Sequence, residues 1–151
     1  IVIITSFILT ACGGSDSNTG INTGVTIAPA PVVLTSERAG QSVARMWNEV
    51  LLVAIRNDFA RPTIHARNLF HVSSAMFDAW SVYKIQTQGF LFGNEVAGFS
   101  CSATDFALPD DVLPHQEQTI SFAAYRIIQH RFAFSPGSVE TMTVADNLMQ
   151  S

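Results

Sequence analysis

Apolar residues recur at helical spacing in several stretches of the chain. In residues 41–58 they repeat at intervals of three and four, which places them on one face of a helix. This set is Val43, Met46, Trp47, Val50, Leu51 and Ala54, and the narrow opposite face carries Arg45, Glu49 and Arg56. The pattern predicts a helix that is mostly packed against a core.

The stretch 62–84 predicts a second helix, which opens at Pro62, where a missing N–H costs nothing. Apolar residues wrap most of its circumference, and Phe70 and Phe77 lie almost opposite the side that carries Val72 and Ala79. This distribution predicts a helix that is buried on nearly all sides. One polar stripe remains, and it consists of Arg67, His71, Ser74, Asp78 and Ser81.

Two more helices are predicted in the second half of the chain. One covers 114–134, opens at Pro114 and carries its apolar face on Ile120, Ala123, Ala124, Ile127 and Ile128. The other starts at Ser135, as its N-cap, with Pro136 in the first turn. The segment 85–113 has no helical period and is broken by glycines and prolines, which predicts a long loop with a short strand near 90–92. We therefore expect an all-α fold of about four helices over residues 36–151.

The beginning of the sequence has a different character. Residues 1–11 are almost all apolar, and Cys12 and a stretch rich in Gly, Ser, Asn and Thr follow them. This order is typical of a secretory signal, although no basic segment precedes it, so we expect the signal to be truncated. Leu9-Thr10-Ala11-Cys12 resembles a bacterial lipobox.

The lipobox resemblance implies that Cys12 carries lipid and that residues 12–35 are a flexible tether. It also implies that the protein is anchored to a membrane of the bacterial cell envelope, on the periplasmic or outer-membrane side. The alternative is an ordinary buried segment with a chance cysteine. If Cys12 carries lipid, Cys101 has no partner in the chain, and its Ser-Cys-Ser context favours a loop cysteine over a nucleophile.

The composition narrows the classes of function. Of 151 residues, 48% are hydrophobic and only 13% are charged, and the net charge is −4. The high hydrophobicity argues against a disordered tail, and the absence of a Lys/Arg cluster argues against a nucleic-acid partner. Charged residues make up about half the usual share of a soluble domain. The apolar residues 1–11 explain the excess of hydrophobic residues. They do not explain the low share of charged residues, which favours a chain whose faces are covered by further polypeptide.

The sequence contains no familiar motif for metal, phosphate or nucleophile chemistry, so we assign no catalytic, cofactor-binding or metal-binding residue. The polar stripe is the one concentrated feature. Arg67 and Asp78 are about 16 Å apart along a helix and cannot pair, whereas Arg131 is a candidate partner for Asp78. Three interpretations are open: a buried structural network of Arg67, His71, Ser74, Asp78 and Arg131, a ligand-facing stripe, or plain solvent exposure.

Residues 44–83 resemble the N-terminal helices of bacterial vanadium-dependent haloperoxidase-like proteins, which belong to the type-2 phosphatidic acid phosphatase superfamily. The resemblance rests on Trp47-Asn48-Glu49, Arg61-Pro62-Thr63 with His65-Ala66-Arg67, and Ala75–Trp80. A second patch, around Ala123–Arg126 and His130–Gly137, is also similar. The resemblance implies an all-helical fold and, for the parent protein, a vanadate or phosphate site built from Lys, Arg, Ser-Gly and His elements.

Those catalytic elements are missing from this sequence, whose one lysine is Lys84. The resemblance therefore implies that the chain is the N-terminal scaffold of a larger protein, packed against a C-terminal catalytic bundle of the same parent chain. Such a parent would oxidise halide with peroxide at a vanadate site outside these residues. A phosphohydrolase parent is the first alternative. The second is a complete, non-enzymatic helical envelope lipoprotein that acts as a binding or scaffold module.

Overall fold

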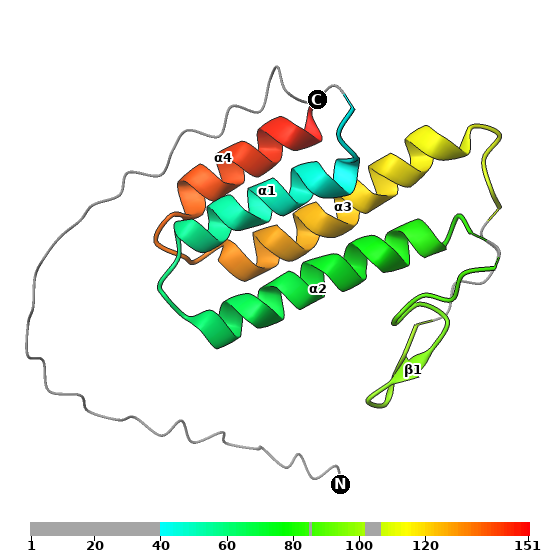
Figure 1. Ribbon diagram of the computed structural model, residues 1–151, viewed down its shortest axis with the longest axis horizontal. Helices are drawn as coiled ribbons and strands as arrows, with labels where there is room; N and C mark the ends of the chain where they lie inside the picture. The colour runs from blue at the N-terminus through cyan, green and yellow to red at the C-terminus, as the bar shows by residue number, and fades with distance from the viewer. Residues whose placement is uncertain (1–39, 85, 102–106) are drawn as a thin grey trace, which may run out of the picture.

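The computed structural model describes residues 40–84, 86–101 and 107–151, in which four α-helices surround a common core. The helices are α1 (Val43–Arg56), α2 (Pro62–Ser81), α3 (Val112–Phe132) and α4 (Ser138–Met149), and a small hairpin pairs β1 (Glu95–Val96) with β2 (Phe99–Ser100) (Figure 1). The predicted all-α class is confirmed. The predicted signal at 1–11, lipidated Cys12 and the tether to residue 35 lie outside the described residues.

The first two helices begin where the sequence predicts. The Ser42 hydroxyl accepts a hydrogen bond from the Arg45 N–H over 3.3 Å and caps α1. Pro62 occupies the first turn of α2. The third helix begins at Val112, and Pro114 still falls in the first turn, where its missing N–H has no partner to lose.

The prediction that Ser135 caps the fourth helix is wrong. Its hydroxyl donates instead to the carbonyl of Phe132 over 2.9 Å, so Ser135 belongs to the turn that ends α3. The N-cap of α4 is Gly137, whose N–H donates to the Asn57 carbonyl over 2.9 Å. The contact with the α1–α2 connection thus displaces the helix start by a few residues.

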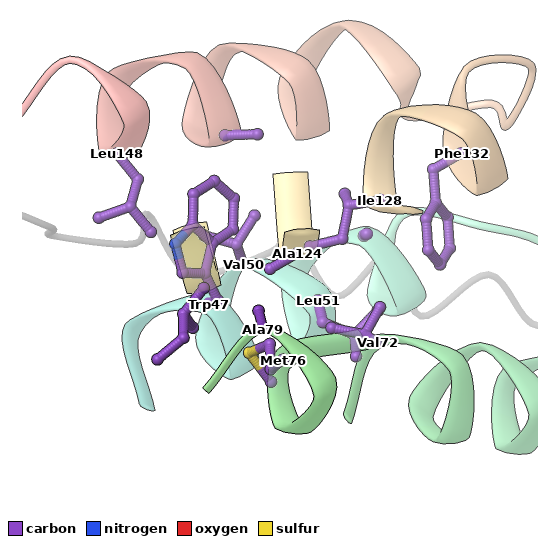
Figure 2. Close-up of a cluster of buried hydrophobic side chains, with 13 residues drawn as sticks. Trp47, Val50, Leu51, Val72, Met76, Ala79, Ala124, Ile128, Phe132 and Leu148 are labelled. Carbon is purple, nitrogen blue, oxygen red and sulfur yellow. The ribbon is translucent and has the colours of Figure 1, made fainter. Parts of the chain in front are cut away.

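Side chains from all four helices fill the core, and Figure 2 shows them lying between the helices, from Leu148 at one side to Phe132 at the other. Burial follows the predicted apolar spacing in α1 and α3. None of the described helices is both long enough and apolar enough to cross a membrane. The fully buried core residues are Trp47, Val50, Leu51, Ala54, Val72, Ala124, Ile128 and Phe132.

The second helix is not buried on all sides, so that prediction is wrong. It packs mainly against α3, runs antiparallel to it and contacts α1 only slightly (Figure 1). One side of α2, which we call the outer face, is exposed in the described structure. It consists of Ala66, Leu69, Phe70, Ser73 and Phe77.

The connection between α2 and α3 contains the hairpin instead of a strand at 90–92. Ala97 and Gly98 form its turn, with φ angles of 52° and 78°, as the twist of a two-residue hairpin requires. Phe92 makes only an isolated bridge to Cys101. The strand is absent at 90–91 because the backbone N–H groups of these residues bind the side chain of Asp78.

Candidate functional site

The polar stripe of α2 meets α3 at His71. A guanidinium N–H of Arg131 lies 2.8 Å from Nδ1 of His71. Because guanidinium only donates, Nδ1 accepts and carries no proton. Burial, followed by the positive charges of Arg131 and Arg67, lowers the pKa of His71 below its ordinary value. His71 is therefore neutral at pH 7 and holds the C-terminal turn of α3 against the first half of α2.

Asp78, farther along the stripe, binds the connection after α2. Its carboxylate accepts hydrogen bonds from the N–H groups of Phe90 and Leu91, the latter over 3.0 Å. Gly89 allows this approach, because a Cβ at that position would lie 2.6 Å from the carboxylate oxygen. The suggested pairing of Asp78 with Arg131 is wrong, since antiparallel packing places Arg131 beside His71 instead.

The remaining stripe residues complete the description. Arg67 is exposed, and Ser74 is half-buried between His71 and Asp78 on the same helix. Ser81 is buried, and its hydroxyl donates to the Asp78 carbonyl over 2.8 Å. The five residues thus do not form one continuous buried network. The structure divides them into a helix–helix contact at His71 and a helix–loop contact at Asp78.

A second set of polar contacts, which the sequence did not reveal, joins the end of α2 to the start of α3. The Tyr83 hydroxyl donates to the His115 carbonyl over 3.1 Å and lies 2.7 Å from the Thr119 hydroxyl. Gln116 donates to the Trp80 carbonyl over 3.2 Å. The sequence pattern did not reveal the contact of Tyr83, because its partners lie on another helix.

Tyr125 and Asp146 make a similar contact between α3 and α4. The Tyr125 hydroxyl donates to the Asp146 carboxylate over 2.8 Å. This hydrogen bond, together with partial burial and the negative charge of Asp146, raises the pKa of Tyr125. The phenol therefore stays protonated and acts as a structural donor.

An apolar cavity of about 350 Å³ lies between α2, α3 and the hairpin. Small side chains form its helical walls, larger ones close it from the connection, and the half-buried Cys101 thiol lies among them. Such a volume falls at the lower end of the range for small-molecule sites. The lining includes Ala75, Ala79, Val82, Leu91, Phe92, Phe99, Cys101 and Ala123.

These residues do not form a site for metal or vanadate. Within the described ranges, no group of three or more His, Cys, Asp and Glu side chains could hold a metal ion. A vanadate ion needs several converging cationic donors. Arg67 and Arg131 are exposed, and Arg131 already donates to His71, so this set does not fit and no step is assigned to it.

Comparison with known proteins does not assign the chain to a family. No family model matches the sequence, no curated protein matches it, and no solved structure matches its fold.

Proposed function

We propose that the four helices are a scaffold for further polypeptide in a protein of the vanadium haloperoxidase-like class. This proposal rests on the outer face of α2. Phe70 and Phe77 lie on it within one exposed strip, and Leu69 extends it. An apolar strip of this kind favours contact with another protein surface.

The chemistry of the described residues supports a scaffold and not a catalyst. His71, Asp78 and Tyr83 each hold one segment of the chain against another. The resemblance of residues 44–83 supplies the class of the parent protein, and the parent's reaction would take place at a vanadate site outside this chain.

The test compares the product of the intact gene with the 151-residue chain. The intact product should brominate a dye with bromide and peroxide only when vanadate is supplied, and the 151-residue chain should be inactive. Bromination by the chain alone would overturn the scaffold role. An intact product that hydrolyses a phosphate ester, and that vanadate inhibits, would instead support the phosphohydrolase parent.

A pair of variants tests the outer face itself. Phe77→Ser should leave the helical content of the isolated chain unchanged, because this side chain is exposed there. In the intact product it should lower the melting temperature, since the contact with the catalytic bundle is lost. Phe122→Ser, at an exposed aromatic of α3 that does not line the apolar cavity, is the matched control. Equal behaviour of the two variants in the intact product would contradict the proposed contact.

The non-enzymatic alternative rests on a different observation, the apolar cavity beside Cys101. A binding module would retain a small apolar ligand there, and the ligand would protect the Cys101 thiol from alkylation. Ala123→Leu fills part of the cavity and should abolish this protection, whereas Ala66→Leu on the outer face should not. Thiol protection in a protein without bromination or phosphatase activity would favour this alternative.

A further inference from the structure

Both short helix connections lie at the same end of the bundle, on the left in Figure 1. One joins α1 to α2 and the other joins α3 to α4. The hydrogen bond from the Gly137 N–H to the Asn57 carbonyl, 2.9 Å long, holds them together. A Cβ on Gly137 would lie 2.3 Å from that of Asn57, so the two backbones are in close contact. We call residues 56–61 and 133–139 the paired loops.

The paired loops expose large apolar side chains at their tips. Phe134 is 99% exposed, Val139 is 80% exposed and Phe59 is 62% exposed. Phe134 is exposed although Phe132, two residues earlier, is fully buried in the core. The Arg61 guanidinium lies over the Phe59 ring, 5.5 Å from its centroid, whereas packing within the described chain does not account for Phe134 and Val139.

Basic residues lie in the paired loops and in the helical turns next to them. Arg56 and Arg61 lie in the paired loops, and Arg67 and Arg131 follow within the adjoining turns of α2 and α3. Arg61 binds the carboxylate of Asp58 over 2.9 Å, and the Asp58 side chain is only 2% exposed. Glu140, on the first turn of α4, is the exposed acid of this end within the described chain.

The opposite end of the bundle is acidic. The end of α2, the hairpin connection, the start of α3 and the end of α4 carry most of the carboxylates, and Lys84 and Arg45 are their basic neighbours. Basic and acidic residues of the described helices are therefore separated along the bundle. The carboxylates are Asp78, Glu95, Asp110, Asp111, Glu117 and Asp146.

We propose that the paired loops dock on an anionic lipid surface. Phe59 and Phe134 enter the boundary between headgroups and acyl chains, where aromatic side chains are favoured. The exposed guanidinium groups of Arg56 and Arg67, which belong to no ion pair in the described structure, bind lipid phosphates, for which Arg is well suited. The positive end thereby faces the negative surface, and the acidic end points away from it.

A lipid surface fits this end better than an acidic protein. A stable protein interface needs about 800 Å² on each partner, whereas the apolar area here is confined to a few side chains at loop tips. Insertion of loop tips into a bilayer needs no complementary partner surface. The proposal is independent of the haloperoxidase-like class, because it uses the described paired loops alone.

The main test reports on the position of the loops and not on binding alone. The full chain carries Cys12→Ser and Cys101→Ser in every sample, which excludes lipidation and leaves one cysteine to label. An environment-sensitive fluorophore on Phe134→Cys should shift to the blue with vesicles of phosphatidylcholine and phosphatidylglycerol. The shift should be much smaller with phosphatidylcholine alone and should weaken in high salt. A fluorophore on Leu113→Cys, an exposed position at the opposite end, should not shift.

A charge variant tests the arginines. Arg56→Gln with Arg67→Gln should lower the apparent affinity for the mixed vesicles by about fivefold per charge removed. Neither residue belongs to an ion pair in the described structure, and circular dichroism checks that the helices remain. Arg45→Gln, at the opposite end, is the matched control and should change the affinity little.

Two results would overturn the proposal. The first is a chain that sediments with the vesicles while the fluorophore at position 134 does not respond, because binding then occurs through another segment, such as residues 1–11. The second is a response of the fluorophore to an acidic polypeptide, such as polyglutamate, but not to mixed vesicles. That outcome would make the paired loops a protein-docking surface.

Discussion

Arg131 donates a hydrogen bond to the imidazole of His71 over 2.8 Å, and this contact joins two residues that are 60 positions apart in the sequence. It lies where the last turn of α3 meets the first half of α2. The contact between α2 and α3 therefore depends on the protonation state of His71, because a protonated Nδ1 can no longer accept a hydrogen bond from Arg131.

The stability of the fold should therefore depend on pH through His71. Its folded pKa is lowered from 6.5, so below that pH the unfolded chain takes up a proton that the folded chain excludes. The free energy of unfolding should be constant above this value and should fall as the pH drops toward the folded pKa. Thermal unfolding at neutral pH and at about pH 5 measures the effect, which we expect to be a few degrees at most in melting temperature.

The matched variants for this prediction are His71→Gln and His130→Gln. The first should reduce the loss of stability between the two pH values, because the titrating group is gone. The second replaces an exposed imidazole of α3 and should leave the loss unchanged. An undiminished loss in His71→Gln would show that another group causes it.

Asp78→Asn should loosen the connection after α2. The carboxylate accepts from two backbone N–H groups, whereas an amide has one acceptor oxygen and turns a donor toward the other N–H. We expect a loss of about 1–3 kcal/mol in the free energy of unfolding and faster amide exchange at Phe90 and Leu91. Asp110→Asn, on an exposed loop, is the control. An unchanged free energy of unfolding and unchanged amide exchange in Asp78→Asn would contradict the structural role of this carboxylate.

Gly137→Ala should separate the paired loops. The new Cβ would lie 2.3 Å from Cβ of Asn57 and 2.8 Å from its carbonyl oxygen, which forces the backbones apart. A cost of about 1–3 kcal/mol is typical of such overpacking. Asn57→Gly removes one of the clashing atoms and should restore part of the loss in the double variant. Wild-type thermal stability in Gly137→Ala would contradict the close contact.

Thr141→Val should be neutral or stabilising, although it removes a polar group. The Thr141 hydroxyl is fully buried in the core and has no hydrogen-bond partner among the residues that the structure describes. A methyl group of similar shape avoids the cost of burying an unpaired hydroxyl, which is about 1–3 kcal/mol. Thermal unfolding compares it with Thr143→Val, whose hydroxyl donates to the Val139 carbonyl on the exposed side of α4. A clear loss of stability in Thr141→Val would show that the hydroxyl has a partner in solution.

Phe132→Ala and Phe134→Ala should differ sharply although they lie two residues apart. The first side chain is fully buried, and its removal should cost about 3–5 kcal/mol. The second is 99% exposed, so its removal should change the free energy of unfolding by less than about 0.5 kcal/mol. Chemical denaturation of the two variants measures both values. Similar losses would mean that Phe134 packs against the chain in solution.

The sequence predicts the helices well because each has a strong apolar period. Trp47, Leu51 and Ala54 mark the buried face of α1, and Ile120, Ala124 and Ile128 mark that of α3, as the structure confirms. The exposure of Phe70 and Phe77 was not predictable from this pattern. Periodicity shows which positions are apolar, but it does not show which neighbour covers them.

The contacts of the candidate site were harder to predict, because they depend on how the helices are paired. Arg131 and Asp78 are both polar residues beside apolar faces, and their pairing was reasonable from the sequence. Antiparallel packing places Arg131 beside His71 in the middle of α2, whereas Asp78 lies near the end of α2 and binds backbone groups of Phe90 and Leu91. Because almost every residue has a backbone N–H, the sequence does not show which of these donors a carboxylate binds.

The preference of α2 for α3 over α1 has a consequence for the rate of folding. α2 buries little against the helix that precedes it, so it gains most of its contacts only when the segment 82–111 closes and brings α3 alongside. Loop closure must precede that gain, so we expect the docking of α2 on α3 to limit the rate of folding and α4 to pack after it. Substitutions between α2 and α3 should then slow folding, whereas those on α4 should mainly speed unfolding.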